Sequence, residues 1–285
     1  MKIVILGASG MLGNAIYRHL SENHKFNVCG TIRSENYLNF FSENLRANLE
    51  SKIDVTNLPG LNSYLEKVKP DVVINCIGVI KQISDKTKIT DLLYLNSVFP
   101  HHLIKISKSL KFKLVQISTD CVFSGKKGNY SENDFADAED LYGISKFLGE
   151  LSAHPDAITI RTSIIGNELV GEHSLLNWFL SQKNSIQGYT KAIFSGFPTI
   201  ELAEIIEKYI LSDLSLCGLF HVSSDPISKY HLLKLIAKKY QKNVEILESS
   251  DMIIDRSLDS NKFRSVTGYE PPNWNILIDK MYRFN

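Results

Sequence analysis

The sequence predicts an α/β protein built on a doubly wound parallel sheet, with a smaller C-terminal lobe. Three observations lead to this fold class. Short runs rich in β-branched residues alternate with stretches whose apolar residues recur at helical spacing. A glycine-rich turn joins the first run directly to the first helical stretch. The chain has 285 residues, enough for one large or two small domains, and shows no internal repeat.

The first part of the chain supplies the sheet. Short apolar runs predict strands at residues 2–6, 27–32, 52–54, 71–76, 113–117 and 157–161. Amphipathic spacing predicts helices between them at residues 11–22, 58–68, 91–110 and 139–153. Pro100 is expected to kink the third of these helices, because proline lacks a backbone N–H. The polar residues 33–48 carry neither pattern, and we assign no helix or strand to them.

Beyond Thr162 the alternation loosens. We expect helices at residues 174–182, 199–211, 228–240 and 274–281, and short strands at 219–222 and 244–247. These elements predict a lobe that packs over the carboxyl ends of the strands. We therefore divide the chain into a sheet domain at residues 1–162 and a lobe at residues 163–285, part of which can return to the sheet. No linker rich in glycine, proline or serine separates the two, so we expect one rigid unit.

Composition and charge exclude several classes of protein. Hydrophobic residues make up 44% of the chain, charged residues 22%, and the net charge is +1, so we expect neither disorder nor binding to nucleic acid or a membrane. No apolar run is long enough for a transmembrane helix, and the run at residues 3–6 ends too soon for a secretory signal. Four cysteines without Cys-x-x-Cys spacing predict reduced thiols and a cytoplasmic protein. No cluster of potential ligands has metal-site spacing, so we predict no metal.

The turn at residues 7–13 has the composition of a pyrophosphate site. Its glycines allow a tight turn and a close approach of a ligand to the backbone, and the following helix N-terminus offers unpaired N–H groups. A position directly after an N-terminal strand is the context that a dinucleotide site requires. The alternative is a tight turn that binds nothing. The predicted contacts are Gly7, Ser9, Gly10, Met11, Leu12 and Gly13.

Arg33 favours NADP(H) over NAD(H). In NAD-selective sites an acidic residue about 20 positions beyond the glycine turn binds the ribose 2′-hydroxyl. Arg33 stands at that distance here. A guanidinium can hold a 2′-phosphate, which a carboxylate would repel. The alternative is that Arg33 is a solvated loop residue.

Further cofactor contacts are expected where other strands end. Asp54 is placed to accept a hydrogen bond from the adenine amino group, although a helix cap would look the same from the sequence. The end of the fourth predicted strand can pass close to the cofactor through its backbone and through Asn75. The predicted contacts are Asp54, Val55, Asn75, Cys76, Ile77, Gly78 and Ser118.

A phenol and an ammonium stand one helical turn apart at Tyr142 and Lys146. This spacing alone is weak support, because Tyr230 and Lys234 share it in the looser C-terminal region. The first pair is favoured since it follows Thr119, which comes directly after a predicted strand. We interpret Tyr230 and Lys234 as an ordinary helix face.

The three residues suit the reduction of a ketone. Hydride addition makes an alkoxide that needs a proton, and Tyr142 is the predicted donor. Bringing a phenol pKa from about 10 towards 7 takes roughly 4 kcal/mol, which Lys146 and the nicotinamide charge are expected to supply together. Thr119 is expected to polarise the carbonyl. Asn96 is predicted to orient a water that relays protons to Lys146, or else to be an exposed polar residue of its helix.

Three segments are similar to the extended short-chain dehydrogenase/reductases: Gly-Ala-Ser-Gly-Met-Leu-Gly at 7–13, Ser-Thr-Asp-Cys-Val-Phe at 118–123 and Tyr-Gly-Ile-Ser-Lys at 142–146. Together with residues 258–263, 267–269 and 271–274, they most resemble the branch of dTDP-4-dehydrorhamnose reductases and related nucleotide-sugar 4-keto reductases. This resemblance implies a Rossmann fold, an NADP(H) site, catalytic roles for Thr119, Tyr142 and Lys146, and a nucleotide sugar held by the second lobe. Homodimers are common in that family.

The implied function is NADPH-dependent reduction of the 4-keto group of a dTDP- or UDP-linked 4-keto-6-deoxy sugar, for surface polysaccharide precursors. Ile164 stands where the branch carries an aromatic residue, so the nucleotide, dTDP, UDP or GDP, stays open. The predicted substrate contacts are Lys81, Thr119, Cys121, Phe123, Tyr142, His173, Asn177 and Trp178.

Two alternatives remain. Cys121 replaces the tyrosine usual in the branch. In the resembling enzymes that make GDP-fucose this position is a cysteine that works with a histidine, and His173 stands in a comparable place, so a bifunctional epimerase-reductase is the first alternative. The second is a non-catalytic NADP-binding regulatory subunit, which the presence of both Tyr142 and Lys146 disfavours.

Overall fold

A seven-stranded parallel sheet forms the centre of the molecule, in the order β11-β6-β5-β4-β1-β2-β3. The computed structural model describes residues 1–22 and 25–284. The order reverses between β1 and β4, which is where doubly wound sheets bind their ligands. The strands are β1 (Lys2–Leu6), β2 (Asn27–Thr31), β3 (Leu49–Glu50), β4 (Val72–Asn75), β5 (Lys113–Ile117), β6 (Ala157–Arg161) and β11 (Gly218–His221).

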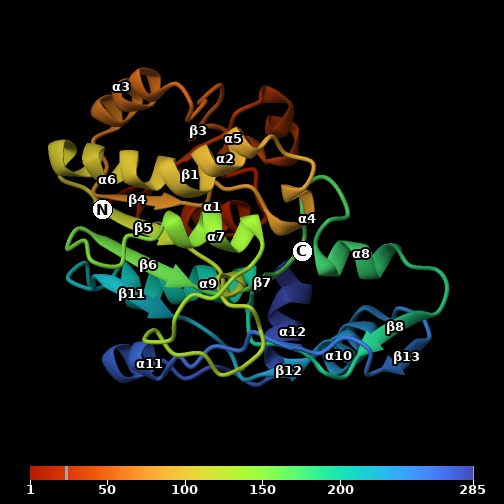
Figure 1. Ribbon diagram of the computed structural model, residues 1–285. Helices are drawn as coiled ribbons and strands as arrows, with labels where there is room; N and C mark the ends of the chain where they lie inside the picture. Colours follow the sequence, from red (N-terminus) through yellow and green to blue (C-terminus); the bar gives the residue numbers. More distant parts are fainter. Residues whose placement is uncertain (23–24, 285) are drawn as a thin grey trace.

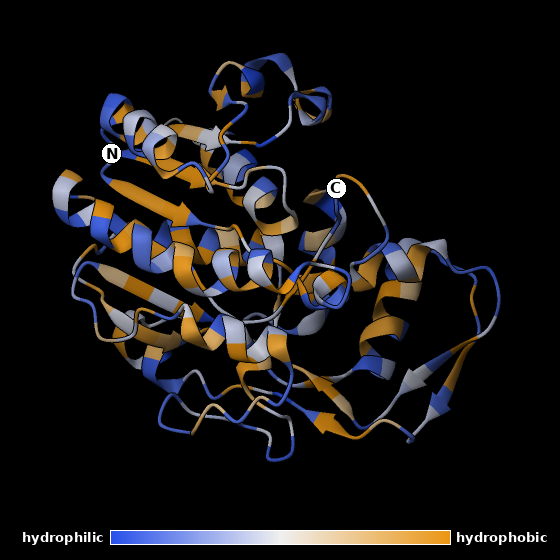
Figure 2. Ribbon diagram, turned by 45° about the horizontal axis from the view of Figure 1, so that its top comes forward, coloured by the Kyte–Doolittle hydropathy of each residue, from blue (hydrophilic) through white to orange (hydrophobic). Residues whose placement is uncertain are grey.

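Helices cover both faces of the sheet (Figure 1). On one face lie α3 (Leu58–Val68), α6 (Phe99–Leu110) and α7 (Leu141–Leu148), and on the other α1 (Met11–Glu22) and α9 (Thr199–Ile205), with α12 (Trp274–Phe284) packed beside α9. The central strands are buried on both sides and therefore read as continuous apolar runs, which Figure 2 shows as hydrophobic arrows inside the fold. The predicted doubly wound α/β fold is confirmed.

The regular elements agree closely with the sequence prediction. Strands at 2–6, 113–117 and 157–161 and helices at 11–22 and 58–68 are confirmed to the residue. The strand predicted at 52–54 is wrong, since β3 is Leu49–Glu50 and Lys52 adopts a positive φ of 62°, which ends the extended backbone. Residues 33–48, to which no helix was assigned, contain η1 (Glu35–Phe40), whose first turn Ser34 caps, and α2 (Glu43–Arg46).

The helix predicted at 91–110 is continuous but irregular. It consists of α5 (Ile89–Leu93), a π-helical segment η2 (Tyr94–Val98) and α6. Pro100 has no N–H to donate to the carbonyl of Asn96, and the helix accommodates this loss through the π-helical segment immediately before it. A Cβ on Gly149 would lie 1.9 Å from that carbonyl oxygen, so the segment packs closely against the end of α7. Helix α7 stops at Leu148 with Gly149 as its C-cap, well before the predicted end at residue 153.

The C-terminal part of the chain is divided between the sheet and a lobe. The segment at 219–222, assigned to the lobe, instead joins β6 in the main sheet as β11, and α9 continues as the π-helical η4 (Ile206–Ile210) under that sheet. The lobe extends to one side in Figure 1. It is built from α8 (Leu175–Ser181), β8 (Ile186–Tyr189), β9 (Ala192–Phe194), β12 (Ile227–Ser228), α10 (Lys229–Tyr240), β13 (Ile246–Ser249) and β14 (Ile254–Asp255). The remaining short elements are α4 (Lys81–Ser84), η3 (Asp120–Val122), β7 (Ile164–Ile165), β10 (Phe197–Pro198) and α11 (Asn261–Thr267).

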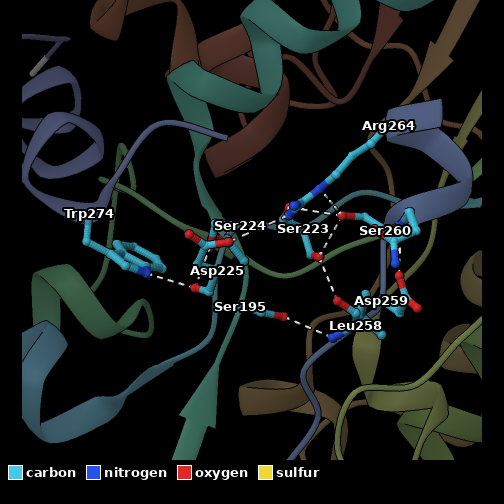
Figure 3. A network of polar contacts seen from close by, with 11 residues as sticks. Ser195, Ser223, Ser224, Asp225, Leu258, Asp259, Ser260, Arg264 and Trp274 are labelled. Carbon is cyan, nitrogen blue, oxygen red and sulfur yellow. Dashed lines mark hydrogen bonds and ion pairs between the residues drawn. The ribbon is translucent and has the colours of Figure 1, made fainter. Parts of the chain in front are cut away.

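A buried polar network fastens the segment between β14 and α11 to the rest of the fold (Figure 3). The Ser195 hydroxyl accepts a hydrogen bond from the backbone N–H of Leu258 at 3.1 Å, and the Ser223 hydroxyl donates to the carbonyl of Leu258 at 2.8 Å. Arg264 Nε donates to the Ser260 hydroxyl at 3.0 Å. Because both serines at 195 and 223 are buried, these bonds hold the position of the residues just before Leu258. Among the residues that the structure describes, no helix has the length and hydrophobicity to cross a bilayer.

Candidate active site

The glycine turn is built as the sequence predicts. Gly7 has φ +86°, in the region that favours glycine, and the Gly10 N–H donates to its carbonyl oxygen at 3.0 Å. A Cβ on Gly13 would lie only 2.1 Å from the same oxygen. The first residue of α1, Met11, follows directly, so the helix N-terminus opens at the turn. Ser9, Gly10 and Met11 reach the surface, whereas the Leu12 side chain points into the core.

The two glycines at 10 and 13 give a matched pair of variants. Gly13→Ala is expected to lower the free energy of unfolding by about 3 kcal/mol, because its methyl group meets rigid backbone. Gly10→Ala is expected to change it by less than about 1 kcal/mol, since that Cβ would have 3.5 Å to the Gly7 oxygen. Urea denaturation of both variants measures the difference. Equal stabilities would show that the turn tolerates a side chain at position 13.

The predicted adenosine end lies on exposed loops. Arg33 is exposed, and its charge contributes to a lowered pKa of Asp54, so the two side chains are neighbours. The largest cause of that lowered pKa is the backbone N–H of Thr56, which donates to Asp54 Oδ1 at 2.9 Å. Asn57, and not Asp54, caps α3, so the helix-cap alternative for Asp54 is wrong. Val55 is buried, and its carbonyl accepts a hydrogen bond from the Tyr94 hydroxyl at 3.2 Å.

Two predicted polar contacts at the strand ends are already engaged within the protein. Asn75 is buried, donates to Gln116 at 2.8 Å and accepts from the Ile77 N–H at 3.1 Å. Ser118 donates to Glu150 Oε1 at 2.6 Å. These side chains therefore shape the loops and leave backbone to face a ligand. Among the predicted contacts at 76–78, Gly78 is exposed, while Cys76 and Ile77 are half-buried beside the glycine turn.

Thr119, Tyr142 and Lys146 come together at the carboxyl ends of β4 and β5. Thr119 caps η3, and its side chain lowers the pKa of the neighbouring Tyr142 phenol against the larger effect of burial. Lys146 is 8% exposed, and its Nζ donates to the carbonyl of Ile117 at 2.6 Å. The same Nζ lies 3.7 Å from where a Cβ on Gly78 would stand. The predicted trio is thus a spatial cluster beside the exposed Gly78, next to the glycine turn.

Helix α7 owes its position to its first residues. Asp140 caps the helix by accepting a hydrogen bond from the Gly143 N–H at 2.9 Å, and it also pairs with Lys81 Nζ at 2.7 Å. A Cβ on Gly143 would lie 2.2 Å from the carbonyl oxygen of Cys121. Glycine at 143 therefore lets the first turn of α7, which carries Tyr142, approach the loop after Thr119.

Burial shifts the pKa values of both ionisable members of the trio, Tyr142 and Lys146. Burial raises the pKa of Tyr142 above its ordinary value, and the neighbouring Cys121 adds to the rise. Burial also lowers the pKa of Lys146 to about 8, against the opposing effect of Glu150. The acidification of Tyr142 expected from Lys146 and the nicotinamide charge together stays a prediction, and burial of the phenol opposes it.

Asn96 is fully buried and not an exposed residue of its helix. Its amide donates to the carbonyl of Val79 at 3.2 Å and to the Ser145 hydroxyl at 3.0 Å, and it accepts from the Val79 N–H at 2.8 Å. It thereby ties the loop after β4 to α7, next to Lys146. Orientation of a water by Asn96 stays a prediction, with both amide hydrogens held by protein.

Some of the predicted substrate contacts lie near Tyr142, and others are engaged elsewhere in the fold. Lys81 pairs with Asp140, two residues before Tyr142, and Cys121 interacts electrostatically with Tyr142 itself. Phe123 is wrong as a pocket residue: it is 0% exposed and stacks on Tyr130 with ring centroids 4.1 Å apart. Asn177 accepts hydrogen bonds from Glu168 N–H and the Ser174 hydroxyl, which brace the loop before α8.

The epimerase-reductase alternative depends on Cys121 and His173. His173 is exposed, and its backbone N–H donates to Glu168 at 2.8 Å. No hydrogen bond, ion pair or electrostatic contact joins it to Cys121 among the described residues, and burial raises the pKa of that thiol to about 12. Trp178 on α8 is 37% exposed.

Three charged residues near the trio were missed by the sequence prediction. Asp120 is buried and follows Thr119 directly, so its place in the Ser-Thr-Asp segment was the available signal. Lys229, at the start of α10, and Arg256, after β14, both interact electrostatically with Asp120 and Cys121. Arg256 Nε also donates to the carbonyl of Phe123 at 2.7 Å. No sequence pattern marks either cation, because the fold brings them from the lobe.

The pair Tyr230 and Lys234 lies on α10, away from the trio. The Lys234 Nζ stands 5.7 Å from the Tyr230 ring centroid, and Tyr230 is hydrogen-bonded to Glu248. All four cysteines are free thiols. Residues 1–22 and 25–284 contain no group of three His, Cys, Asp or Glu side chains that could hold a metal ion.

Comparison with known proteins gives one family match. The family model described as "RmlD substrate binding domain" matches residues 1–283. A dTDP-4-dehydrorhamnose reductase of Aggregatibacter actinomycetemcomitans is 24% identical over 96% of this chain and 95% of its own. A methionine adenosyltransferase 2 subunit beta of Danio rerio is 27% identical over 84% and 74%. The structure of dTDP-4-dehydrorhamnose reductase from Bacillus anthracis in complex with NADP superimposes with TM-score 0.81 at 22% identity, covering 100% of this chain and 99% of that one.

Proposed function

Because the chain belongs to the RmlD substrate binding domain family, we propose that it is an NADPH-dependent oxidoreductase that reduces the 4-keto group of a nucleotide-linked sugar. The substrate proposed is a dTDP- or UDP-linked 4-keto-6-deoxy sugar, and the product a precursor of surface polysaccharide made in the cytoplasm. The observation that carries the proposal is the cluster of Thr119, Tyr142 and Lys146 beside Gly78 and the glycine turn.

The residues present fit a dinucleotide. Gly7 and Gly13 leave backbone, and no Cβ, at the turn that opens α1, and Gly10 is exposed there. Gly78 is exposed beside Lys146, where any side chain would meet the Asn96 amide oxygen at 2.9 Å. The chemistry that NADPH supplies when bound is hydride donation to the keto carbon. The solved structure of a similar protein supports this cofactor, since the Bacillus anthracis reductase was solved in complex with NADP.

The side chains of the trio account for the proton that the reduction needs. The Tyr142 hydroxyl donates its proton to the sugar oxygen as that oxygen gains charge. Thr119 donates a hydrogen bond to the same oxygen and stabilises the charge. Lys146, fixed on the Ile117 carbonyl, places a positive charge near the phenol when the phenolate forms.

The charges around the trio suit a substrate that carries phosphates. Lys81, Lys229 and Arg256 surround the loop at Asp120 and Cys121, and burial lowers the pKa of Lys229. Desolvated cations gain most from an anionic ligand, and a nucleoside diphosphate supplies two phosphoryl groups. Arg256 is held in place because its Nε donates to the carbonyl of Phe123. The serine network also fixes the backbone two residues further on, at Leu258.

Arg33 is expected to select NADPH. Arg33→Ser should raise the KM for NADPH by about 10- to 100-fold, since a charge-assisted bond to the 2′-phosphate is lost. The KM for NADH should change little, because NADH has no such phosphate. Steady-state kinetics with both cofactors measure the two values, and Arg283→Ser, an exposed arginine of α12, is the control. An equal change for both cofactors would contradict a role in recognising the phosphate.

A non-catalytic NADP-binding subunit is the second candidate. One observation favours it, namely that matched relatives include methionine adenosyltransferase 2 subunit beta. The geometry of Tyr142 and Lys146 favours the reductase instead. The epimerase-reductase has less support, because among the described residues no hydrogen bond or electrostatic contact joins Cys121 to His173.

A panel of keto sugars tests the proposal. dTDP-, UDP- and GDP-linked 4-keto-6-deoxy sugars are supplied one at a time, and NADPH oxidation is followed by its absorbance. Turnover with at least one of them is the expected result. Tight NADPH binding without turnover on any of them would support the regulatory subunit, and deuterium from heavy water bound to carbon beside the carbonyl would support epimerisation.

A further inference from the structure

Asp120 is a buried carboxylate that the proposed reaction does not use. It is 9% exposed, and its Oδ1 accepts a hydrogen bond from the Thr119 hydroxyl at 3.1 Å. Its backbone is fixed as well, because its N–H donates to the carbonyl of Thr162 at 3.1 Å. A carboxylate in this position touches the one hydroxyl that has to face the substrate oxygen.

The hydrogen bonds of Thr119 can be counted. A threonine hydroxyl has one hydrogen and two lone pairs. The backbone N–H of Cys121 donates to Thr119 Oγ1 at 3.1 Å and occupies one lone pair. With Asp120 ionised, the single hydrogen of Thr119 is directed to Asp120. Thr119 then has no hydrogen for a substrate oxygen, and only Tyr142 can donate to it.

Protonation of Asp120 changes this count. The carboxyl O–H then donates to the second lone pair of Thr119, so that the hydrogen of Thr119 is free to point at the substrate oxygen beside that of Tyr142. Rotating Thr119 away from an ionised Asp120 would instead leave a buried carboxylate oxygen facing a lone pair, which is costly.

We infer that Asp120 is a positioning residue whose protonation decides whether the Thr119 hydroxyl can donate to a substrate oxygen. The inference rests on the proposed function. The groups that face Asp120 are Thr119 and Cys121 on its own loop, Tyr142 on α7, and the cations Lys229 and Arg256 from the lobe.

A dependence on pH follows. Burial raises the pKa of Asp120 above its ordinary value, and Arg256 is the largest opposing influence. The protonated, active form is therefore present below this raised pKa and is lost as the pH rises through it. Reduction should decline over that range while Tyr142 and Lys146 keep their protons.

Asp120→Asn tests the inference, because an amide can donate to Thr119 at every pH. The variant should keep at least about a tenth of the wild-type kcat at low pH and should lose the decline of kcat with rising pH. Asp137→Asn is the matched control, since Asp137 accepts from Ser124 at 2.7 Å on a nearby loop and should leave the wild-type profile unchanged. An unchanged profile in Asp120→Asn, or inactivity equal to that of Thr119→Val at every pH, would overturn the inference.

A second measurement needs no substrate. In protein labelled with ¹³C at the aspartate carboxyl carbon, the NMR signal missing from Asp120→Asn belongs to Asp120. It should titrate at higher pH than the other aspartates, and titration in the ordinary range or below would overturn the inference. Absence of turnover by the wild type in the sugar panel would count against the proposed function, whereas this titration decides the state of Asp120 by itself.

Discussion

Tyr142→Phe should lower kcat for NADPH-dependent reduction of a 4-keto nucleotide sugar by about 10²- to 10⁴-fold, the range contributed by a positioned general acid. The variant removes one oxygen and keeps the ring, so the contacts of α7 with the loop at Cys121 remain. Affinity for NADPH should therefore stay within about threefold of wild type. Steady-state absorbance and a fluorescence titration of NADPH measure the two quantities.

The chain provides its own control for this variant. Tyr230 has the same four-residue spacing to a lysine, Lys234, and it lies on α10 with its hydroxyl bonded to Glu248. Tyr230→Phe should leave kcat and NADPH affinity unchanged. Wild-type turnover in Tyr142→Phe, or an equal loss in both variants, would remove Tyr142 from the reaction.

The parts of the fold that could be predicted are those in which one local pattern decides. Strands β1, β5 and β6 are apolar runs buried on both faces, and α1 and α3 repeat apolar residues at helical spacing, so their limits follow from periodicity. The place of β11 in the sheet could not be predicted, because pairing with β6 depends on a contact between distant segments. The same holds for η2, whose π-helical turn reflects both Pro100 and close packing at Gly149.

The candidate site also combines features that a local pattern predicts with features that depend on the folded structure. Sequence spacing could predict that Tyr142 and Lys146 share a helix face and that Thr119 follows a strand. The orientation of side chains decided the rest: Phe123 turns into the core, and His173 stays on an exposed loop. A family pattern carries positions along the chain and not the direction in which each side chain points, which is why the prediction for Phe123 failed and the one for His173 stays a prediction.

Glu150→Gln should lower the free energy of unfolding by about 3–5 kcal/mol, because it leaves a buried guanidinium without its counter-charge. Arg161 bonds Glu150 through Nε at 2.8 Å and Nη2 at 2.7 Å, and the side chains are only 3% and 4% exposed. Little water can reach Arg161 to replace the lost carboxylate. Urea denaturation at neutral pH measures the change.

Two controls separate burial from charge. Glu139→Gln removes an equal charge from an exposed pair with Lys126 and should cost less than about 1 kcal/mol. Glu150→Gln combined with Arg161→Met removes both buried charges and should recover part of the loss. Since Glu150 also raises the pKa of Lys146, the single variant should lower the pH at which Lys146 loses its proton. A cost for Glu150→Gln no greater than that for Glu139→Gln would mean that the buried pair contributes nothing to holding β6 against the end of α7.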